Sequence, residues 1–229
     1  MMKFGHISAI AILSTITLAT PVVASEQNET ERVDRTVQIR AGGQLRLKNF
    51  SGKVTITGSS RSDMVVRAVR RAPRERLDHI KLEIVETASG VSIEANKKDD
   101  NWRDRNNNVV ETEFEIQLPA DVSLNVDVFS SDIFVKGVRG HQRLKTFSGE
   151  IDVVDADAGI DAETFSGDIG VTIVQGTSAS VDFDSFSGAL DSKVPMSYRT
   201  QGRRRVRADI GSGGTDYHFK TFSGDVRIR

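Results

Sequence analysis

Apolar and polar residues alternate along almost the whole chain from Arg35 onward. In TVQIRAGGQLRLKNFSGKVTITG (residues 36–58) and ETEFEIQLP (residues 111–119), the apolar residues recur two positions apart. Segments of this period, bounded by Gly, Asn, Asp and Ser, are typical of half-buried β-strands. Residues 80–95 fit a β-hairpin that turns at ETASG, residues 72–80 favour a helical turn, and residues 96–108 form a long polar loop. The pattern therefore predicts an all-β protein.

A short unit built on Phe-Ser-Gly recurs along the chain. From Phe129 onward its phenylalanines are separated by 18, 18, 21 and 36 residues. The last step is twice 18, so we expect a degenerate copy around Ala208–Asp216. A period near 20 is typical of solenoids and other repeat arrays. The residues of the unit are Phe50, Ser51 and Gly52; Phe129; Phe147, Ser148 and Gly149; Phe165, Ser166 and Gly167; Phe186, Ser187 and Gly188; and Phe222, Ser223 and Gly224.

Within each unit, the apolar side chains switch from one face of the strand to the other. Leu144 lies three residues before Phe147, whereas Ile151 and Val153 lie four and six residues after it. A straight strand cannot place all four on one face, because an odd separation reverses the side. A bend at Ser-Gly can do so, and glycine tolerates the positive φ that such a bend needs. We therefore expect Phe in the core, Ser and Thr hydroxyls on turn backbone groups and Gly at the corner.

The length of the repeat suggests one coil of a solenoid. Eighteen extended residues span about 60 Å, which suits two or three short strands with turns. The predicted fold is an all-β, β-solenoid or β-helix-like stack of short strands with an approximately 18-residue repeat. The N-terminal half is elaborated by the hairpin. An antiparallel β-sandwich is the alternative, and the hairpin favours it locally.

The N-terminus has the organisation of a secretory signal peptide. A lysine near the start precedes an apolar run from Ile7 to about Ala19, and small residues lead to a cleavage site after Ala24. We expect a signal peptide over residues 1–24, a mobile leader over 25–34 and a single β-strand-repeat domain over 35–229, with its clearest repeats over 121–229. The chain is predicted to be exported, either to the periplasm or outside the cell, with no membrane span after cleavage.

Composition narrows the function classes. After cleavage the chain would carry 30 basic and 32 acidic residues, so it has no global field to attract nucleic acid. It has no cysteine, which excludes disulfides. Two basic runs, residues 67–76 and 202–207, indicate either a polyanion-binding patch or a solvated charged face.

The repeated serine does not indicate an enzyme. A serine nucleophile needs one specific base and one oriented acid. The predicted mature chain has three histidines, His79, His141 and His218, each in a different sequence setting. We therefore predict a non-catalytic protein with no catalytic residue, metal ligand or cofactor.

The residue after the repeat glycine is often acidic, as at Asp132, Glu150 and Asp168. Stacked coils would align these carboxylates into a row that could bind Ca²⁺ or supply an acid–base pair for cleaving a glycan. The same row also serves as a solvated face that discourages aggregation through sheet edges. Trp102, in the polar loop, suits either stacking on a sugar or covering a sheet edge. Trp102 and the three acids are the candidate surface contacts for a ligand.

The signal peptide, LRLKNFSGKVTITG and the successive TFSGDI units together resemble the bacterial putative-adhesin family, β-strand-repeat domains of unknown function. The resemblance extends over about residues 35–229, although VFSSDI lacks the glycine and SFSGAL lacks the acid. It implies an extracytoplasmic all-β repeat domain without established catalytic residues.

The leading functional hypothesis is an adhesin-like structural or interaction domain of the cell envelope. Its expected partner is an envelope glycan or a protein. The alternatives are a polysaccharide-active β-helix enzyme, a lyase or hydrolase that uses two acids of the row, and an envelope-stress accessory protein.

Overall fold

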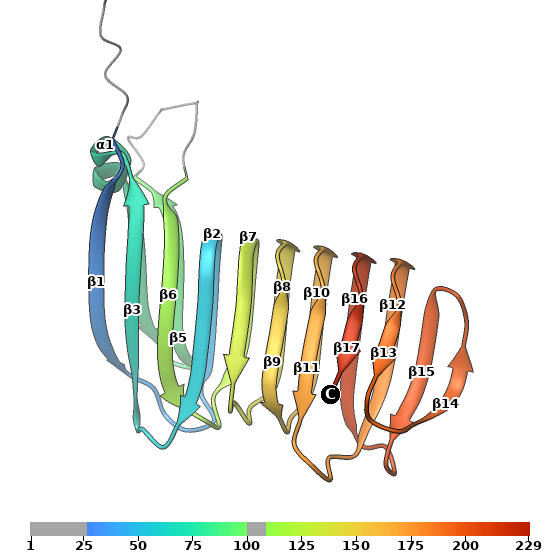
Figure 1. Ribbon diagram of the computed structural model, residues 1–229. Helices are drawn as coiled ribbons and strands as arrows, with labels where there is room; N and C mark the ends of the chain where they lie inside the picture. Colours follow the sequence, from blue (N-terminus) through green and yellow to red (C-terminus); the bar gives the residue numbers. More distant parts are fainter. Residues whose placement is uncertain (1–26, 100–108) are drawn as a thin grey trace, which may run out of the picture.

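The structure is a computed structural model that describes residues 27–99 and 109–229, and strands dominate this part of the chain (Figure 1). The alternating segments form an open sheet, and one short helix, α1 (Arg74–His79), occupies the expected helical turn. The all-β prediction is confirmed. The strands of the N-terminal half are β1 (Glu29–Gln38), β2 (Gln44–Ser59), β3 (Asp63–Ala72), β4 (Ile80–Thr87), β5 (Gly90–Lys98) and β6 (Glu111–Pro119).

The C-terminal half is a stack of coils, each made of two strands that meet at a Phe-Ser-Gly corner. We call the strand before the corner the first arm and the strand after it the second arm. Two long strands, β2 and β7, bend at their corner and contribute to both arms. The strands are β7 (Ser123–Lys136), β8 (Gln142–Ser148), β9 (Ile151–Ala156), β10 (Ile160–Ser166), β11 (Ile169–Ile173), β12 (Ala179–Ser187), β13 (Leu190–Ser192), β14 (Met196–Gln201), β15 (Arg205–Ile210), β16 (Thr215–Ser223) and β17 (Val226–Ile228).

Successive coils pair in parallel and in register. Thr164 of β10 lies opposite Thr146 of β8 and opposite Thr221 of β16. Equivalent residues of neighbouring coils are therefore separated by one strand spacing, about 4.8 Å. This geometry confirms the solenoid-like prediction. Among the described strands, antiparallel pairs occur at the two ends of the stack, so the sandwich alternative does not describe the whole.

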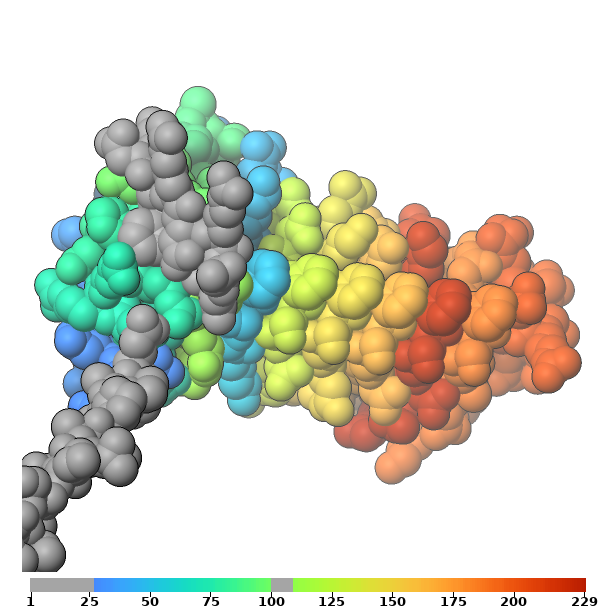
Figure 2. All heavy atoms as spheres, turned by 90° about the horizontal axis from the view of Figure 1, so that it is seen from above, coloured from blue at the N-terminus to red at the C-terminus, as the bar shows by residue number. Residues whose placement is uncertain are grey.

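The coils do not stack in sequence order. The coil β16–β17 lies between β10–β11 and β12–β13, pairing with both in parallel (Figure 2). Residues 196–210 form the antiparallel pair β14 and β15, which extends the sheet beyond β12. The expected degenerate copy around Ala208–Asp216 was therefore wrong. That segment ends one hairpin strand and begins the inserted coil.

The N-terminal end of the stack is built from antiparallel strands. The predicted hairpin is confirmed as β4 and β5, and β5 pairs in parallel with the first arm of β2. Strand β6 pairs in parallel with the second arm of β2, and β3 and β1 follow it in antiparallel order. Because β1 begins at Glu29 and pairs with β3 throughout, the leader expected over residues 25–34 is ordered strand from Glu29 onward.

The core lies between the two arms. Leu144 and Thr146 point inward from the first arm, and Ile151 and Val153 point inward from the second. The odd separation of Thr146 and Ile151 requires the predicted bend, and Gly149 provides it with a φ of 156°. The bend is confirmed, but it leaves Phe147 outside.

The phenylalanines of the repeat are not core residues. Each alternates with a buried neighbour, as Phe147 does with Thr146, and is 41–55% exposed. The expectation that Phe fills the core was wrong, because the strand stays regular through Phe and bends after it. The corrected residues are Phe50, Phe129, Phe147, Phe165, Phe186 and Phe222.

In three of the six coils a threonine takes the inward place at the corner. Its hydroxyl donates a hydrogen bond to a corner carbonyl: Thr146 to Ser131 at 3.0 Å, Thr164 to Gly149 at 3.4 Å and Thr221 to Gly224 at 2.9 Å. The predicted role of threonine in satisfying turn backbone is confirmed. The serines Ser148, Ser166, Ser187 and Ser223 are exposed.

Aspartates just after the corner link neighbouring coils by hydrogen bonds. Asp132 accepts a hydrogen bond from the backbone N–H of Glu150 at 3.0 Å, and Asp168 accepts one from the N–H of Asp225 at 2.9 Å. Asp225 in turn accepts from the N–H of Ala189 at 2.9 Å. The carboxylates of Asp132 and Asp168 are thus engaged within the stack.

Glycine is required at Gly167 for two reasons. Its φ is 148°, and a Cβ there would lie 2.0 Å from the carbonyl oxygen of Gly149 in the neighbouring coil. We expect Gly167→Ala to lower the free energy of unfolding by roughly 2–4 kcal/mol, measured by denaturant unfolding. Gly176 is the matched control, because its φ is 87° but no atom lies within 4 Å of its added Cβ. Equal losses of unfolding free energy in Gly167→Ala and Gly176→Ala would show that the close contact between coils adds nothing to the cost at Gly167.

Asp168 should make stability depend on pH. The N–H of Asp225 and the guanidinium of Arg227, 2.8 Å away, hold the pKa of this carboxyl below its usual value, although partial burial opposes them. A carboxyl with a depressed folded pKa stabilises the protein above its unfolded pKa of about 4, and this contribution is lost as pH falls through the folded value.

We therefore expect Asp168→Asn to lower Tm at pH 7 by roughly 2–4 °C and to reduce the fall of Tm below about pH 4. Thermal unfolding followed from pH 7 to pH 2 measures both. Asp191→Asn, at an exposed position of β13, is the control. An unchanged pH profile in the Asp168 variant would contradict the assigned role.

Candidate functional site: an aromatic ladder and its groove

The six phenylalanines of the repeat form one continuous ladder of stacked rings. Adjacent ring centroids are 4.6–4.9 Å apart, and the planes of neighbouring rings differ by 19° or less. The spacing follows from the coil stack, because each ring occupies the same corner position. In spatial order the ladder is Phe50, Phe129, Phe147, Phe165, Phe222 and Phe186.

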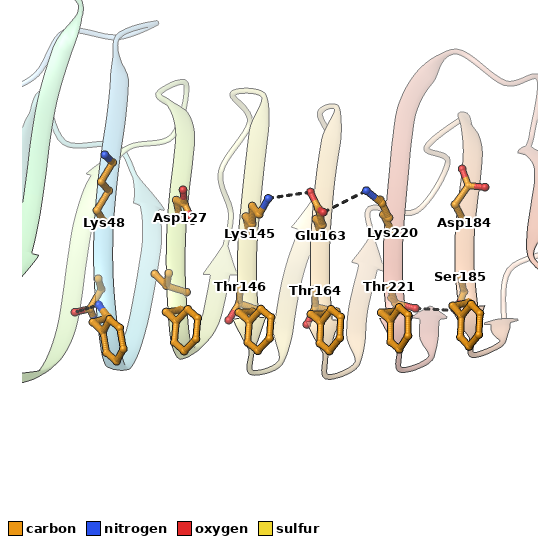
Figure 3. A pocket seen from close by; sticks show the side chains of 18 of the residues that line it. Lys48, Asp127, Lys145, Thr146, Glu163, Thr164, Asp184, Ser185, Lys220 and Thr221 are labelled. Atoms are coloured by element: carbon orange, nitrogen blue, oxygen red, sulfur yellow. Dashed lines mark hydrogen bonds and ion pairs between the residues drawn. The ribbon is translucent and has the colours of Figure 1, made fainter. Parts of the chain in front are cut away.

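The ladder lines an open groove of about 940 Å³ on the outer face of the first arm (Figure 3). Ala95 and Asn96 of β5 lie at one end of the groove, and Arg204 lies at the other. The Arg204 guanidinium stands 4.6 Å from the centre of the Phe186 ring, a cation–π contact that covers the terminal ring. The ladder is therefore an apolar strip of defined length.

A row of charged side chains runs beside the ladder, two residues earlier in each coil. Figure 3 shows its members in spatial order, and their charges alternate without exception. Glu163 lies 3.4 Å from both Lys145 and Lys220. Opposite charges on adjacent strands attract, whereas like charges there would repel. The row consists of Lys48, Asp127, Lys145, Glu163, Lys220 and Asp184.

The row continues into the hairpin. The Arg205 side chain donates two hydrogen bonds to Asp184, at 2.7 and 2.9 Å, and holds the pKa of that carboxyl below its usual value. This bidentate pair orients the last acid of the row. Positive and negative charges thus alternate along the groove, and the aromatic strip is its main apolar feature.

The candidate contacts predicted from the sequence do not gather at this groove. Asp132, Glu150 and Asp168 lie beyond the corner, at the start of the second arm, and Trp102 lies outside the described residues. Over residues 27–99 and 109–229 no group of three or more His, Asp or Glu side chains is placed to hold a metal ion. The three acids remain proposed contacts, and the carboxylates of Asp132 and Asp168 also accept backbone hydrogen bonds between coils.

Ion pairs engage most arginines of the first basic run and two of the four arginines of the second. This favours the solvated-face interpretation over a free polyanion patch. The pairs are Arg67–Asp34, Arg70–Glu31, Arg71–Glu113 and Arg74–Asp78 in the first run, and Arg205–Asp184 and Arg207–Asp182 in the second.

Sequence reasoning missed the charged row, although a signal for it was present. The residue two positions before each repeat phenylalanine is Lys, Asp or Glu in all six copies. In sequence order Glu163 is followed by Asp184, whereas in the structure Lys220 stands between them. The alternation becomes visible once the coil order is known.

No helix in the described part of the chain is long and apolar enough to cross a membrane. No curated protein matches the chain significantly. The solved structure of a putative cell adhesion protein from Clostridium sporogenes ATCC 15579 is similar, with a TM-score of 0.65 at 11% identity, over 87% of this chain and 99% of that one. This likeness shows a shared fold.

A second solved structure, of a putative adhesin from Bacteroides fragilis NCTC 9343, matches at 14% identity over 87% of this chain and 97% of that one, with a TM-score of 0.30, too low to support an argument about fold. Residues 120–229, which hold the clearest coils, match the family model Toastrack DUF4097. This match confirms the resemblance to the putative-adhesin family, whose β-strand-repeat domains have no known function.

Proposed function

We propose that the chain is an exported, non-catalytic, adhesin-like interaction protein that binds a protein partner through the aromatic groove. The observation that carries this proposal is the exposure of six contiguous phenylalanines, each 41–55% accessible. Soluble monomeric proteins rarely expose a contiguous apolar patch of more than a few hundred Å², and larger patches mark interaction sites.

The geometry of the ladder favours protein over glycan. Sugars pack against the free face of an aromatic ring, but here the ring faces within the ladder are covered by neighbouring rings, and Arg204 lies over the outer face of Phe186. The groove therefore offers ring edges, which form a strip roughly 24 Å long at about 4.8 Å per strand. Apolar side chains of a partner protein complement such a strip.

The polysaccharide-active alternative receives no comparable support. It requires two carboxylates that face a substrate across a cleft. Asp132 and Asp168 each accept a backbone N–H from the following coil, which occupies the groups that would act. No specific observation favours the envelope-stress alternative.

Photo-crosslinking from the groove tests the proposed binding surface. In cells that express the full chain, a benzophenone analogue of phenylalanine at Phe147 should form adducts with protein, identified by mass spectrometry. The same analogue at Phe134, which lies on the second arm, is the control. We expect adducts at position 147 that are absent at 134. The same adducts at both positions, or none at 147, would contradict the proposal.

Export is tested by intact mass. The protein recovered from the extracytoplasmic fraction should lack residues 1–24 and begin at Ser25, because the small residues before that position suit signal peptidase. Full-length protein confined to the cytoplasm would overturn this part of the proposal.

A further inference from the structure

We propose that the aromatic groove binds a second copy of the same chain, in a two-fold symmetric, antiparallel dimer. This inference rests on the proposed function of the groove as a protein-binding surface and names its partner. The order of charges beside the ladder favours this partner.

The charged row is self-complementary when one copy is reversed. An alternating row with an even number of members begins and ends on opposite charges. Antiparallel apposition therefore places Lys48 against the partner subunit's Asp184, Asp127 against the partner subunit's Lys220 and Lys145 against the partner subunit's Glu163. The register between adjacent strands establishes this order along the groove.

The flanking strands continue the same pattern. Glu94 of β5 lies opposite Lys48, and Arg205 of β15 lies opposite Asp184. The row thus extends to eight alternating charges, and reversal places Glu94 against the partner subunit's Arg205. Each added member keeps the self-complementarity of the row.

A two-fold axis gives this arrangement directly. An axis that lies in the interface, perpendicular to the ladder, reverses the ladder of the second copy and keeps each charged row on the same side. The rings then meet rings, and the charged rows meet each other in opposite directions. Two-fold dimers use one surface patch on both subunits in this way.

In a second row on the same face, four of the six members are also complementary on reversal, and the other two, Asn125 and His218, face each other. Four residues before each phenylalanine, the spatial order begins with Arg46 and ends with Asp182, and its two central members are Arg143 and Asp161. Reversal places Arg46 against the partner subunit's Asp182 and Arg143 against the partner subunit's Asp161. The charged residues of both rows are therefore complementary under the same two-fold axis.

The size of the surface agrees with a dimer. A phenylalanine side chain presents on the order of 200 Å², so six rings at the observed exposure leave on the order of 500 Å² of aromatic surface per copy. Pairing two ladders would bury about 1,000 Å², and the flanking charged rows bring the total to the range of roughly 1,200–2,000 Å² typical of stable interfaces.

Sedimentation equilibrium of the purified chain, with complementary charge reversals, tests the dimer. Lys145→Glu places like charges across the two-fold axis at Glu163, and Glu163→Lys does the same at Lys145. Each variant alone should dimerise at least tenfold more weakly than the natural chain. An equimolar mixture of the two should recover the dimer, because each Lys145→Glu subunit then meets a Glu163→Lys subunit.

The mixture separates the interface from folding. Each reversal also disturbs ion pairs within its own subunit, and mixing cannot repair those. Circular dichroism verifies that both variants fold. Lys136→Glu makes the same charge change on the second arm and should leave the dimer intact, whereas Phe147→Ala should weaken it.

Three results would overturn the inference: a natural chain that is monomeric at about 100 μM, variants that dimerise normally, or a mixture that fails to recover the dimer. The first of these leaves the groove's proposed function standing if crosslinking at Phe147 still captures another protein. Crosslinks between two copies of the chain at Phe147 support both proposals.

Discussion

The in-register stacking of parallel coils is the constraint on which the rest of this structure depends. Every coil position becomes a row of side chains about 4.8 Å apart, so a residue is acceptable only if it tolerates its equivalents on both sides. Phenylalanine does so by stacking ring on ring, and threonine by donating to a corner carbonyl of its own or a neighbouring coil. Charges of one sign repel at this spacing, and the row beside the ladder alternates. The acids after the corner keep one sign, and there Asp132 and Asp168 each accept a backbone N–H of the next coil.

The same constraint explains which sequence predictions succeeded. The period near 18 and the bend at Ser-Gly follow from the coil itself. The period could be read from the spacing of the repeat phenylalanines, and the bend from the odd separation of Leu144 and Ile151 around Gly149. The inward residue was misassigned because Phe147 is the more hydrophobic candidate. Thr146 lies two positions from Leu144 and so shares its face, while Phe147 does not. At this corner the alternation of side chains along the strand, and not their hydrophobicity, decides which one points inward.

The candidate site was less accessible to sequence reasoning than the fold. Its ladder is assembled from residues between Phe50 and Phe222, and their neighbours are set by the coil order. A repeat suggests that coils follow one another as they do in the chain, and nothing in the motif itself indicates that the copy at Phe222 stands before the copy at Phe186. Two of the acids that were predicted as ligand contacts, Asp132 and Asp168, accept backbone hydrogen bonds that link neighbouring coils.

The inserted position of β16–β17 has a consequence for how the protein reaches its native state. Strands β12 to β15 leave the ribosome or the export channel before the coil that must separate them from β10. Direct docking of β12 on β10 would bring Glu163 beside Asp184, a like-charge contact that disfavours premature closure. In the native order β16 separates the two strands and places Lys220 between Glu163 and Asp184, through pairings between segments distant in sequence, which are slow to form. The inserted coil thus brings a cation between two carboxylates that would otherwise be neighbours.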